Sequence, residues 1–235
     1  SFKDIEAENF TDAYDMLKAG LADVCKEYSN LPDRVSVDSD DRDIFLRLKA
    51  QKGTKADVKN SLKTIMRMMQ AVYEKPVILL IDEYDVPLAK ASEKDTADNK
   101  FYSSMLDIIR GIMSTALKDN EYLRFAVITG CLHIAKESIF TGTNNFVSYS
   151  VLDEDFSEYF GFSDREVAEL LSAADRMDKA DAIREWYDGY VFGNHYVYCP
   201  WDVMSYISAL RKRKNAKPKN YWEFTSHNGI LLNFV

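Results

Sequence analysis

The chain has 235 residues, of which 46% are hydrophobic and 29% are charged, and its formal net charge at pH 7 is −8. These values are ordinary for a globular protein with one large or two modest domains. The acidic balance argues against an extensive nucleic-acid-binding surface. One dense basic run, at 211–214 with Lys217 and Lys219, is typical of a solvated loop, with a nucleic-acid contact as the alternative.

The cysteines and histidines are too scattered to indicate a metal cluster. Cys25, Cys131 and Cys199 form neither a CxxC pair nor a zinc pattern, which fits a reduced cytoplasmic setting. No apolar run approaches the length of a membrane span, and no signal peptide is visible. We therefore expect a cytoplasmic protein without a membrane partner.

The first 73 residues are expected to be mainly helical. Residues 1–5 are expected to be the end of a strand that enters a turn, and Asn9 or Thr11 can cap a helix that runs to about Tyr28. Residues 29–43 are interpreted as an exposed loop of solvated charge, with aspartates at Asp38, Asp40, Asp41 and Asp43. A short helix from 44 to 48, ended by Gly53, and a helix over 58–73, opened by residues 54–57, complete this part.

The most informative stretch comes next. Five apolar residues, 77–81, follow Pro76 and predict a short strand buried on both faces, as in a parallel sheet. Asp82, Glu83 and Asp85 follow at the carboxyl end of that strand, the edge where open α/β sheets bind ligands. A hydrophobic strand followed by Asp-Glu has the form of a Walker B motif, whose Asp holds Mg²⁺ and whose Glu polarises the attacking water. The alternative is that these acids cap the next helix or pair with surface lysines.

A second strand supplies the context that a Walker B motif requires. Residues 86–99 are expected to be a polar connection, followed by a helix over 101–117 and a buried strand over 122–129. Such a unit predicts a right-handed parallel crossover. Thr129 would then lie at the same sheet edge as Asp82, where it could sense a terminal phosphate or only cap a turn. Lys136 could face phosphate or be a surface lysine.

The composition changes after about Asp153, and residues 155–210 are expected to be mostly helical. Before this change, a short helix is expected near 134–139. After it, a capping box at 163–166 opens a helix that ends near Ala174, and a second helix is expected over 178–187. A hairpin over 191–198 that turns at Gly193-Asn194 and a helix from Pro200 to about Leu210 follow. The aromatic residues of this part are interpreted as a packed core, with base stacking as the alternative: Trp186, Tyr187, Tyr190, Trp201 and Trp222.

Taken in order, these segments resemble the bacterial and archaeal AAA-ATPase-like family of P-loop proteins, often joined to a C-terminal PD-(D/E)xK nuclease-like domain. The resemblance covers nearly the whole chain. It rests on SFKDI at 1–5, VILLIDEYDVPL at 77–88, Thr129-Gly130, IAKESIF at 134–140, Asn144-Asn145, YFGF at 159–162, WYDGY at 186–190, Phe192-Gly193, Tyr198, Pro200-Trp201, Tyr221-Trp222, Thr225-Ser226 and Asn228.

The resemblance implies an α/β fold in which a parallel-sheet P-loop core, about 1–150, precedes a mainly helical lid, about 151–235. It implies ATP and Mg²⁺ as cofactors, with Asp82 positioning Mg²⁺, Glu83 polarising water, and Thr129 and Lys136 near the phosphates. It also implies that a nuclease-like domain beyond residue 235 could contact nucleic acid. The rival functions are a catalytically inactive interaction module of the same fold and a metal-dependent phosphodiesterase formed by Asp82, Glu83 and Asp85.

Three departures from the family pattern affect these expectations. No G-x-x-x-x-G-K-[ST] phosphate loop occurs in the 235 residues. In the family that loop precedes the strand that Ser1 is expected to leave, so residues 1–235 alone should bind ATP poorly and not hydrolyse it. His133 stands where relatives often have Arg, which would weaken a phosphate contact. Cys199 replaces an Asn that often precedes the Pro-Trp pair, with an effect expected only on a helix cap.

Overall fold

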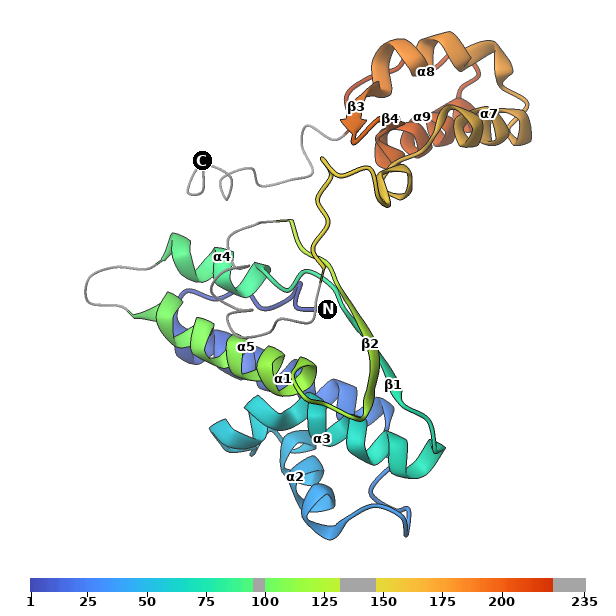
Figure 1. Ribbon diagram of the computed structural model, residues 1–235. Helices are drawn as coiled ribbons and strands as arrows, with labels where there is room; N and C mark the ends of the chain where they lie inside the picture. Colours follow the sequence, from blue (N-terminus) through green and yellow to red (C-terminus); the bar gives the residue numbers. More distant parts are fainter. Residues whose placement is uncertain (95–99, 132–146, 222–235) are drawn as a thin grey trace. The chain divides into compact units, whose positions relative to one another are not determined.

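The computed structural model describes residues 1–94, 100–131 and 147–221 (Figure 1). The chain divides into two compact units, the first reaching Phe146 and the second beginning at Val147. The helix expected near 134–139, with His133 and Lys136, lies outside the described residues, as does Trp222.

The first unit is a mixed α/β structure with a small parallel sheet. Its elements are α1 (Phe10–Glu27), α2 (Ser39–Lys49), α3 (Lys55–Tyr73), β1 (Val77–Ile81), α4 (Val86–Glu93), α5 (Phe101–Leu117) and β2 (Leu123–Ile128). Residues 1–5 form a turn, in which the Ile5 N–H donates to the Phe2 carbonyl at 3.1 Å, so the turn expected there is present and the strand is not.

The two long helices before the sheet begin where the sequence predicts. The Asn9 side chain accepts a hydrogen bond from the Asp12 N–H and caps α1, whose inner face buries Leu17 and Leu21. Thr54 and Asp57 form a capping box at the start of α3: each side chain accepts from the other residue's backbone N–H. Both caps satisfy N–H groups that the first helical turn leaves without partners.

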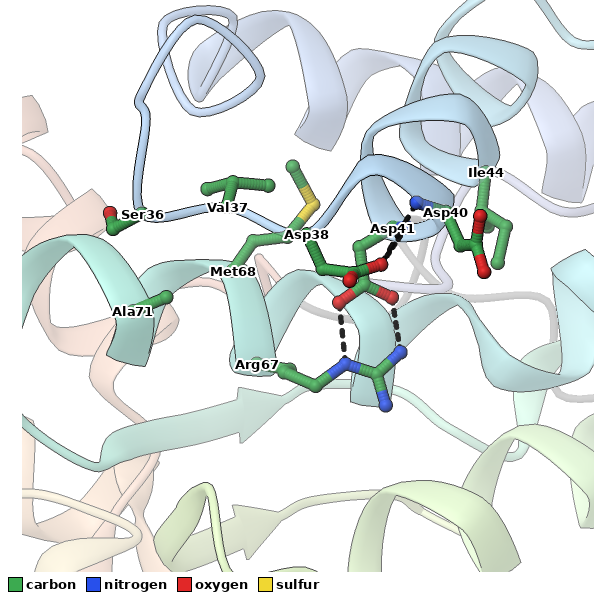
Figure 2. A pocket seen from close by; sticks show the side chains of 9 residues that line it. All are labelled: Ser36, Val37, Asp38, Asp40, Asp41, Ile44, Arg67, Met68 and Ala71. Carbon is green, nitrogen blue, oxygen red and sulfur yellow. Dashed lines mark hydrogen bonds and ion pairs between the residues drawn. The ribbon is translucent and has the colours of Figure 1, made fainter.

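The exposed loop predicted over 29–43 is wrong for its last part, because residues 39–43, with three of the four aspartates, are helical, whereas residues 29–38 form no helix or strand. The Asp38 side chain accepts from the N–H groups of Asp40 and Asp41 and so starts α2 at Ser39. Carboxylates are favourable there because they satisfy free N–H groups and oppose the positive end of the helix dipole. Asp41 is buried and pairs with Arg67 of α3, and these residues line a pocket (Figure 2).

A second correction concerns the polar connection predicted over 86–99. Residues 86–93 instead form α4, with Pro87 in its first turn, where proline's missing N–H costs nothing. Leu88, Ala89 and Ala91 of this helix are buried, and α4 packs against α5. Lys90, Glu93 and Lys94 lie among these apolar residues, and such a mixture is typical of a polar connection.

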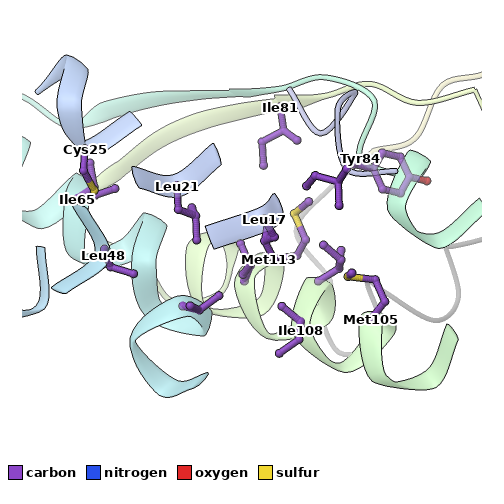
Figure 3. Close-up of a cluster of buried hydrophobic side chains, with 14 of the residues drawn as sticks. Leu17, Leu21, Cys25, Leu48, Ile65, Ile81, Tyr84, Met105, Ile108 and Met113 are labelled. Atoms are coloured by element: carbon purple, nitrogen blue, oxygen red, sulfur yellow. The ribbon is translucent and has the colours of Figure 1, made fainter. Parts of the chain in front are cut away.

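The parallel crossover is confirmed. Strand β1 pairs with β2 in parallel, and the register aligns Ile81 with Ile128 at the end of both strands. Helix α3 contacts β1, α5 contacts β2, and α1 packs on both helices, which places the main core on one face of the sheet (Figure 3). The chain therefore brings the carboxyl ends of β1 and β2 to the same edge.

The other face of the sheet does not match the prediction of strands buried on both sides. Side chains alternate along a strand, so every second residue points away from the helical layer. On that face Ile78, Leu80, Phe125 and Val127 keep between 47% and 70% of their surface exposed. An apolar run marked the strand correctly, but the described residues supply helices to only one of its faces.

The second unit is helical with a small hairpin. Its elements are η2 (Ser157–Tyr159), α7 (Asp164–Ala173), η3 (Met177–Lys179), α8 (Ala180–Tyr187), β3 (Asp188–Phe192), β4 (His195–Tyr198) and α9 (Pro200–Lys212). The predicted capping box between Ser163 and Glu166 is present, and β3 and β4 are antiparallel around Gly193, whose φ is +52°. Leu171, Ile183, Val203 and other buried residues form a separate core.

The aromatic residues of this unit are less buried than predicted. Trp186, Tyr190 and Trp201 are each about half exposed, whereas Tyr187, the other described member of the predicted set, lies in the core. Trp201 lies outside the buried stripe of α9, whose apolar members are Val203, Tyr206, Ile207 and Leu210. Across the described ranges, none of the helices combines the length and the apolar character that crossing a membrane requires.

Candidate functional site

The carboxyl ends of β1 and β2 are joined closely. The Thr129 N–H donates to the Ile81 carbonyl at 2.9 Å and so extends the sheet ladder by one residue. The Tyr84 N–H then donates to the Thr129 carbonyl at 3.2 Å. These two bonds bring Thr129 alongside the segment 82–84, and they fix the backbone that carries the predicted Walker B acids.

Asp82 and Thr129 are in direct contact. The Thr129 hydroxyl donates a hydrogen bond to Oδ1 of Asp82. The Asp82 carbonyl accepts from the Phe2 N–H at 3.0 Å, so the N-terminal turn also packs on this strand end. Asp82 is exposed, which leaves its carboxylate accessible to solvent and to an ion.

Glu83 has a strained backbone and a partly buried side chain. Its φ is +54°, in the left-handed region that residues with a Cβ seldom adopt, at a cost of about 1–3 kcal/mol. Its Oε2 atom is shielded from water and has no hydrogen-bond partner in the part of the chain that the structure describes. Strain and an unsatisfied polar atom of this kind cluster at functional sites, where a substrate, water or ion completes the hydrogen bonding.

Tyr84 and Asp85 are buried next to these acids, and the exposed Gly130 lies close to both. Asp85 is buried, and its carbonyl accepts from the N–H groups of Leu88 and Ala89 at 3.0 and 2.9 Å at the start of α4. Burial, followed by the Asp85 charge, raises the pKa of Tyr84 to about 12. A Cβ at Gly130 would lie 2.6 Å from Asp85 Oδ1 and 2.7 Å from Tyr84 Cε1. Only glycine fits this close approach of the two loops.

The electrostatics of this edge are dominated by negative charge. The pKa of the Cys131 thiol is raised, mainly because the thiol is partly buried and to a smaller extent because of the negative charges of Asp85, Glu83 and Asp82. Asp82, Glu83 and Asp85 therefore act on one small region next to the end of β2. A phosphate would be repelled there unless a cation lay between it and these acids.

The donor set at this edge suits Mg²⁺ better than a metal that needs a full protein cage. The described residues contain no group of three or more His, Cys, Asp or Glu side chains that could hold a metal ion. Mg²⁺ commonly uses one or two carboxylates and completes its octahedron with water and substrate phosphates. Asp82, exposed at the strand end, fits that role. The same finding counts against a phosphodiesterase site formed by the three acids alone.

The structure thus brings Asp82, Glu83 and Thr129 together, while Lys136 lies outside the described residues. The sequence did not identify Tyr84, Gly130 or Cys131 as neighbours of this site. The available signal was weak: Gly130 follows Thr129 directly, but its close approach to Asp85 depends on the crossover geometry and not on any motif.

The chain matches a family model described as "Predicted AAA-ATPase" over residues 1–140. It is also 29% identical over 175 residues to an "Uncharacterized protein in vnfD 5'region" of Azotobacter chroococcum mcd 1. That alignment covers 73% of this chain and 31% of the relative, so the chain spans about a third of the relative's length. No solved structure matches.

Proposed function

This chain belongs to the AAA-ATPase-like family, and from that premise we propose that the full-length protein binds ATP together with Mg²⁺ and hydrolyses it. The proposal includes a larger P-loop sheet, of which β1 and β2 form part. It also includes a phosphate loop in the full-length protein, since backbone N–H groups and a loop lysine supply most phosphate binding in such sites.

The proposal is supported mainly by the backbone conformation of Glu83 and by its shielded carboxylate oxygen. It follows an Asp at the carboxyl end of a parallel strand, its backbone is strained at φ +54°, and Oε2 is shielded without a partner among the described residues. The combination distinguishes Glu83 from Glu74, which has the same φ at the end of α3 but is exposed. A carboxylate held in this way is suited to accept a proton from, or to orient, a water molecule at the sheet edge.

Asp82 is assigned the contact with Mg²⁺. The ion would neutralise phosphate charge at an edge where Asp82, Glu83 and Asp85 otherwise repel it. Asp82 is the exposed member of the three, whereas Asp85 is buried behind Tyr84 and Gly130. Asp85 is therefore proposed to stabilise the loop between β1 and α4 and not to bind the ion. Lys136 is proposed to face the phosphates.

The second unit, which begins at Val147, is proposed to act as a lid on the ATPase core. A compact unit with its own hydrophobic core can move as one body when nucleotide is bound or released. This arrangement would couple the nucleotide cycle to a change in the position of the lid.

The test is a titration of the full-length protein with a fluorescent ATP analogue, with and without Mg²⁺. We expect saturable binding that Mg²⁺ strengthens, and Asp82→Ala should remove most of the Mg²⁺ effect. Asp23→Ala is the matched control, because Asp23 is an exposed acid of α1 that pairs only with Lys26 in the described structure. Absence of binding by the wild-type protein would support an inactive interaction module instead.

A further inference from the structure

In the hydrogen bond between Thr129 and Asp82, Thr129 is the donor, and this limits what else its hydroxyl can do. An ionised carboxylate has only acceptors, so the proton in this hydrogen bond comes from the Thr129 hydroxyl. A hydroxyl has one proton to donate. The oxygens of a nucleotide phosphate are also acceptors, so Thr129 cannot donate to a phosphate while it donates to Asp82.

The backbone of Thr129 favours the contact with Asp82 on geometric grounds. Its N–H is bound to the Ile81 carbonyl at 2.9 Å, and its carbonyl accepts from the Tyr84 N–H at 3.2 Å. Both bonds join Thr129 to the segment that flanks Asp82. These bonds place the Thr129 backbone where its hydroxyl reaches the Asp82 carboxylate.

We propose that Thr129 is a positioning residue, which fixes the Asp82 carboxylate for Mg²⁺, and that it does not sense the terminal phosphate. This inference rests on the proposed function, because it assigns Asp82 to the Mg²⁺ contact. A hydrogen bond to Oδ1 would limit rotation of the carboxylate that is proposed to hold the ion. Hydrogen-bond partners of metal ligands typically contribute 10–100-fold to metal affinity.

The test compares three forms of the full-length protein: wild type, Thr129→Val and Thr129→Ser. Valine keeps the shape of threonine without the hydroxyl, and serine keeps the hydroxyl. The readout is the Mg²⁺ concentration that gives half of the maximal Mg²⁺-dependent binding of a fluorescent ATP analogue. We expect Thr129→Val to raise this midpoint about 10–100-fold, while Thr129→Ser stays near the wild type. Binding in the presence of EDTA should be the same in all three.

The outcomes separate this inference from the function on which it rests. If the wild type shows Mg²⁺-dependent binding and Thr129→Val leaves the midpoint unchanged while lowering turnover, Thr129 acts on the phosphate and the inference is wrong. If the wild type shows no Mg²⁺-dependent binding, the proposed function fails first and the inference falls with it. If Thr129→Val does not fold, as judged by circular dichroism, Thr129→Ala is measured in its place.

Discussion

Arg47 of α2 holds Asp57 of α3 through two hydrogen bonds: Nε donates to Oδ2 and Nη2 to Oδ1, each at 3.0 Å. The same Oδ2 accepts from the Thr54 N–H at 2.9 Å. One buried carboxylate thus joins α2 to the start of α3 and closes the capping box. The hydrogen bond from Arg47, followed by those from Thr54, lowers the pKa of Asp57.

Removing this carboxylate should destabilise the first unit. We expect Asp57→Ala to lower the free energy of unfolding by about 2 kcal/mol, because it removes a charge-assisted pair and a helix cap together. Urea denaturation followed by circular dichroism measures the change. Asp23→Ala is the control, since the exposed pair of Asp23 with Lys26 should contribute almost nothing. Equal effects of the two variants would contradict the importance of the Asp57 pair.

The contribution of Asp57 should also depend on pH. Its pKa is lowered in the folded state, so the stabilisation is complete above the unfolded pKa of about 4 and is lost as the pH falls through the folded value. We therefore expect the difference in free energy of unfolding between wild type and Asp57→Asn to be constant from about pH 5 to about pH 7. The difference should shrink below about pH 4. A difference that grew on acidification would have the wrong sign.

Gly130 should be sensitive to the smallest substitution. A Cβ there would lie 2.6 Å from Asp85 Oδ1 and 2.7 Å from Tyr84 Cε1, so both side chains would have to move. We expect Gly130→Ala to cost about 1–3 kcal/mol of stability, as overpacking of a tight site does. Gly20→Ala is the matched control: Gly20 lies on the exposed side of α1 with nothing within 4 Å of its added Cβ. That change should stabilise the protein by about 0.5–1 kcal/mol, because alanine is the better helix former.

The sequence predicts local features of this fold well where one short pattern decides the structure. The helix start at Thr54, the capping box at Ser163, the hairpin turn at Gly193 and the parallel crossover around β1 and β2 all follow from spacing and residue type. The proximity of Thr129 to Asp82 follows from the crossover, because parallel strands end at the same edge.

The features that were missed depend on contacts between distant residues. Nothing near Asp41 in the sequence indicates that it pairs with Arg67, so the aspartate run was interpreted as solvated charge. Likewise, the close approach of Gly130 to Tyr84 arises only when the crossover brings two loops together, and no residue pattern indicates the positive φ of Glu83. A pattern of residue types records neither backbone strain nor which side of an apolar strand is covered.

Glu83→Gln in the full-length protein should separate binding from hydrolysis. Glutamine keeps the size of the side chain but cannot accept the proton of the attacking water, so we expect turnover to fall on the order of 10²-fold or more with ATP binding retained. Glu74→Gln is the control, because Glu74 has the same φ of +54° but is exposed at the end of α3. Turnover at the wild-type level in Glu83→Gln would remove Glu83 from the catalytic assignment.

The aromatic residues of α9 divide between core and surface. Tyr206 is buried, its hydroxyl donates to the Ala216 carbonyl at 3.2 Å, and its ring lies 5.9 Å from that of Tyr187. Tyr206→Ala should therefore cost about 3–5 kcal/mol, as large core truncations do. Trp201, five positions earlier on the same helix, is 52% exposed, so Trp201→Ala should cost no more than about 1 kcal/mol.

Chemical denaturation of both variants followed by circular dichroism gives the comparison without relying on tryptophan fluorescence. A loss for Trp201→Ala as large as that for Tyr206→Ala would mean that the ring of Trp201 is covered in the protein in solution. In that case the interpretation of the aromatic residues as a packed core would apply to Trp201 after all, because burial of an aromatic ring is what makes its truncation costly.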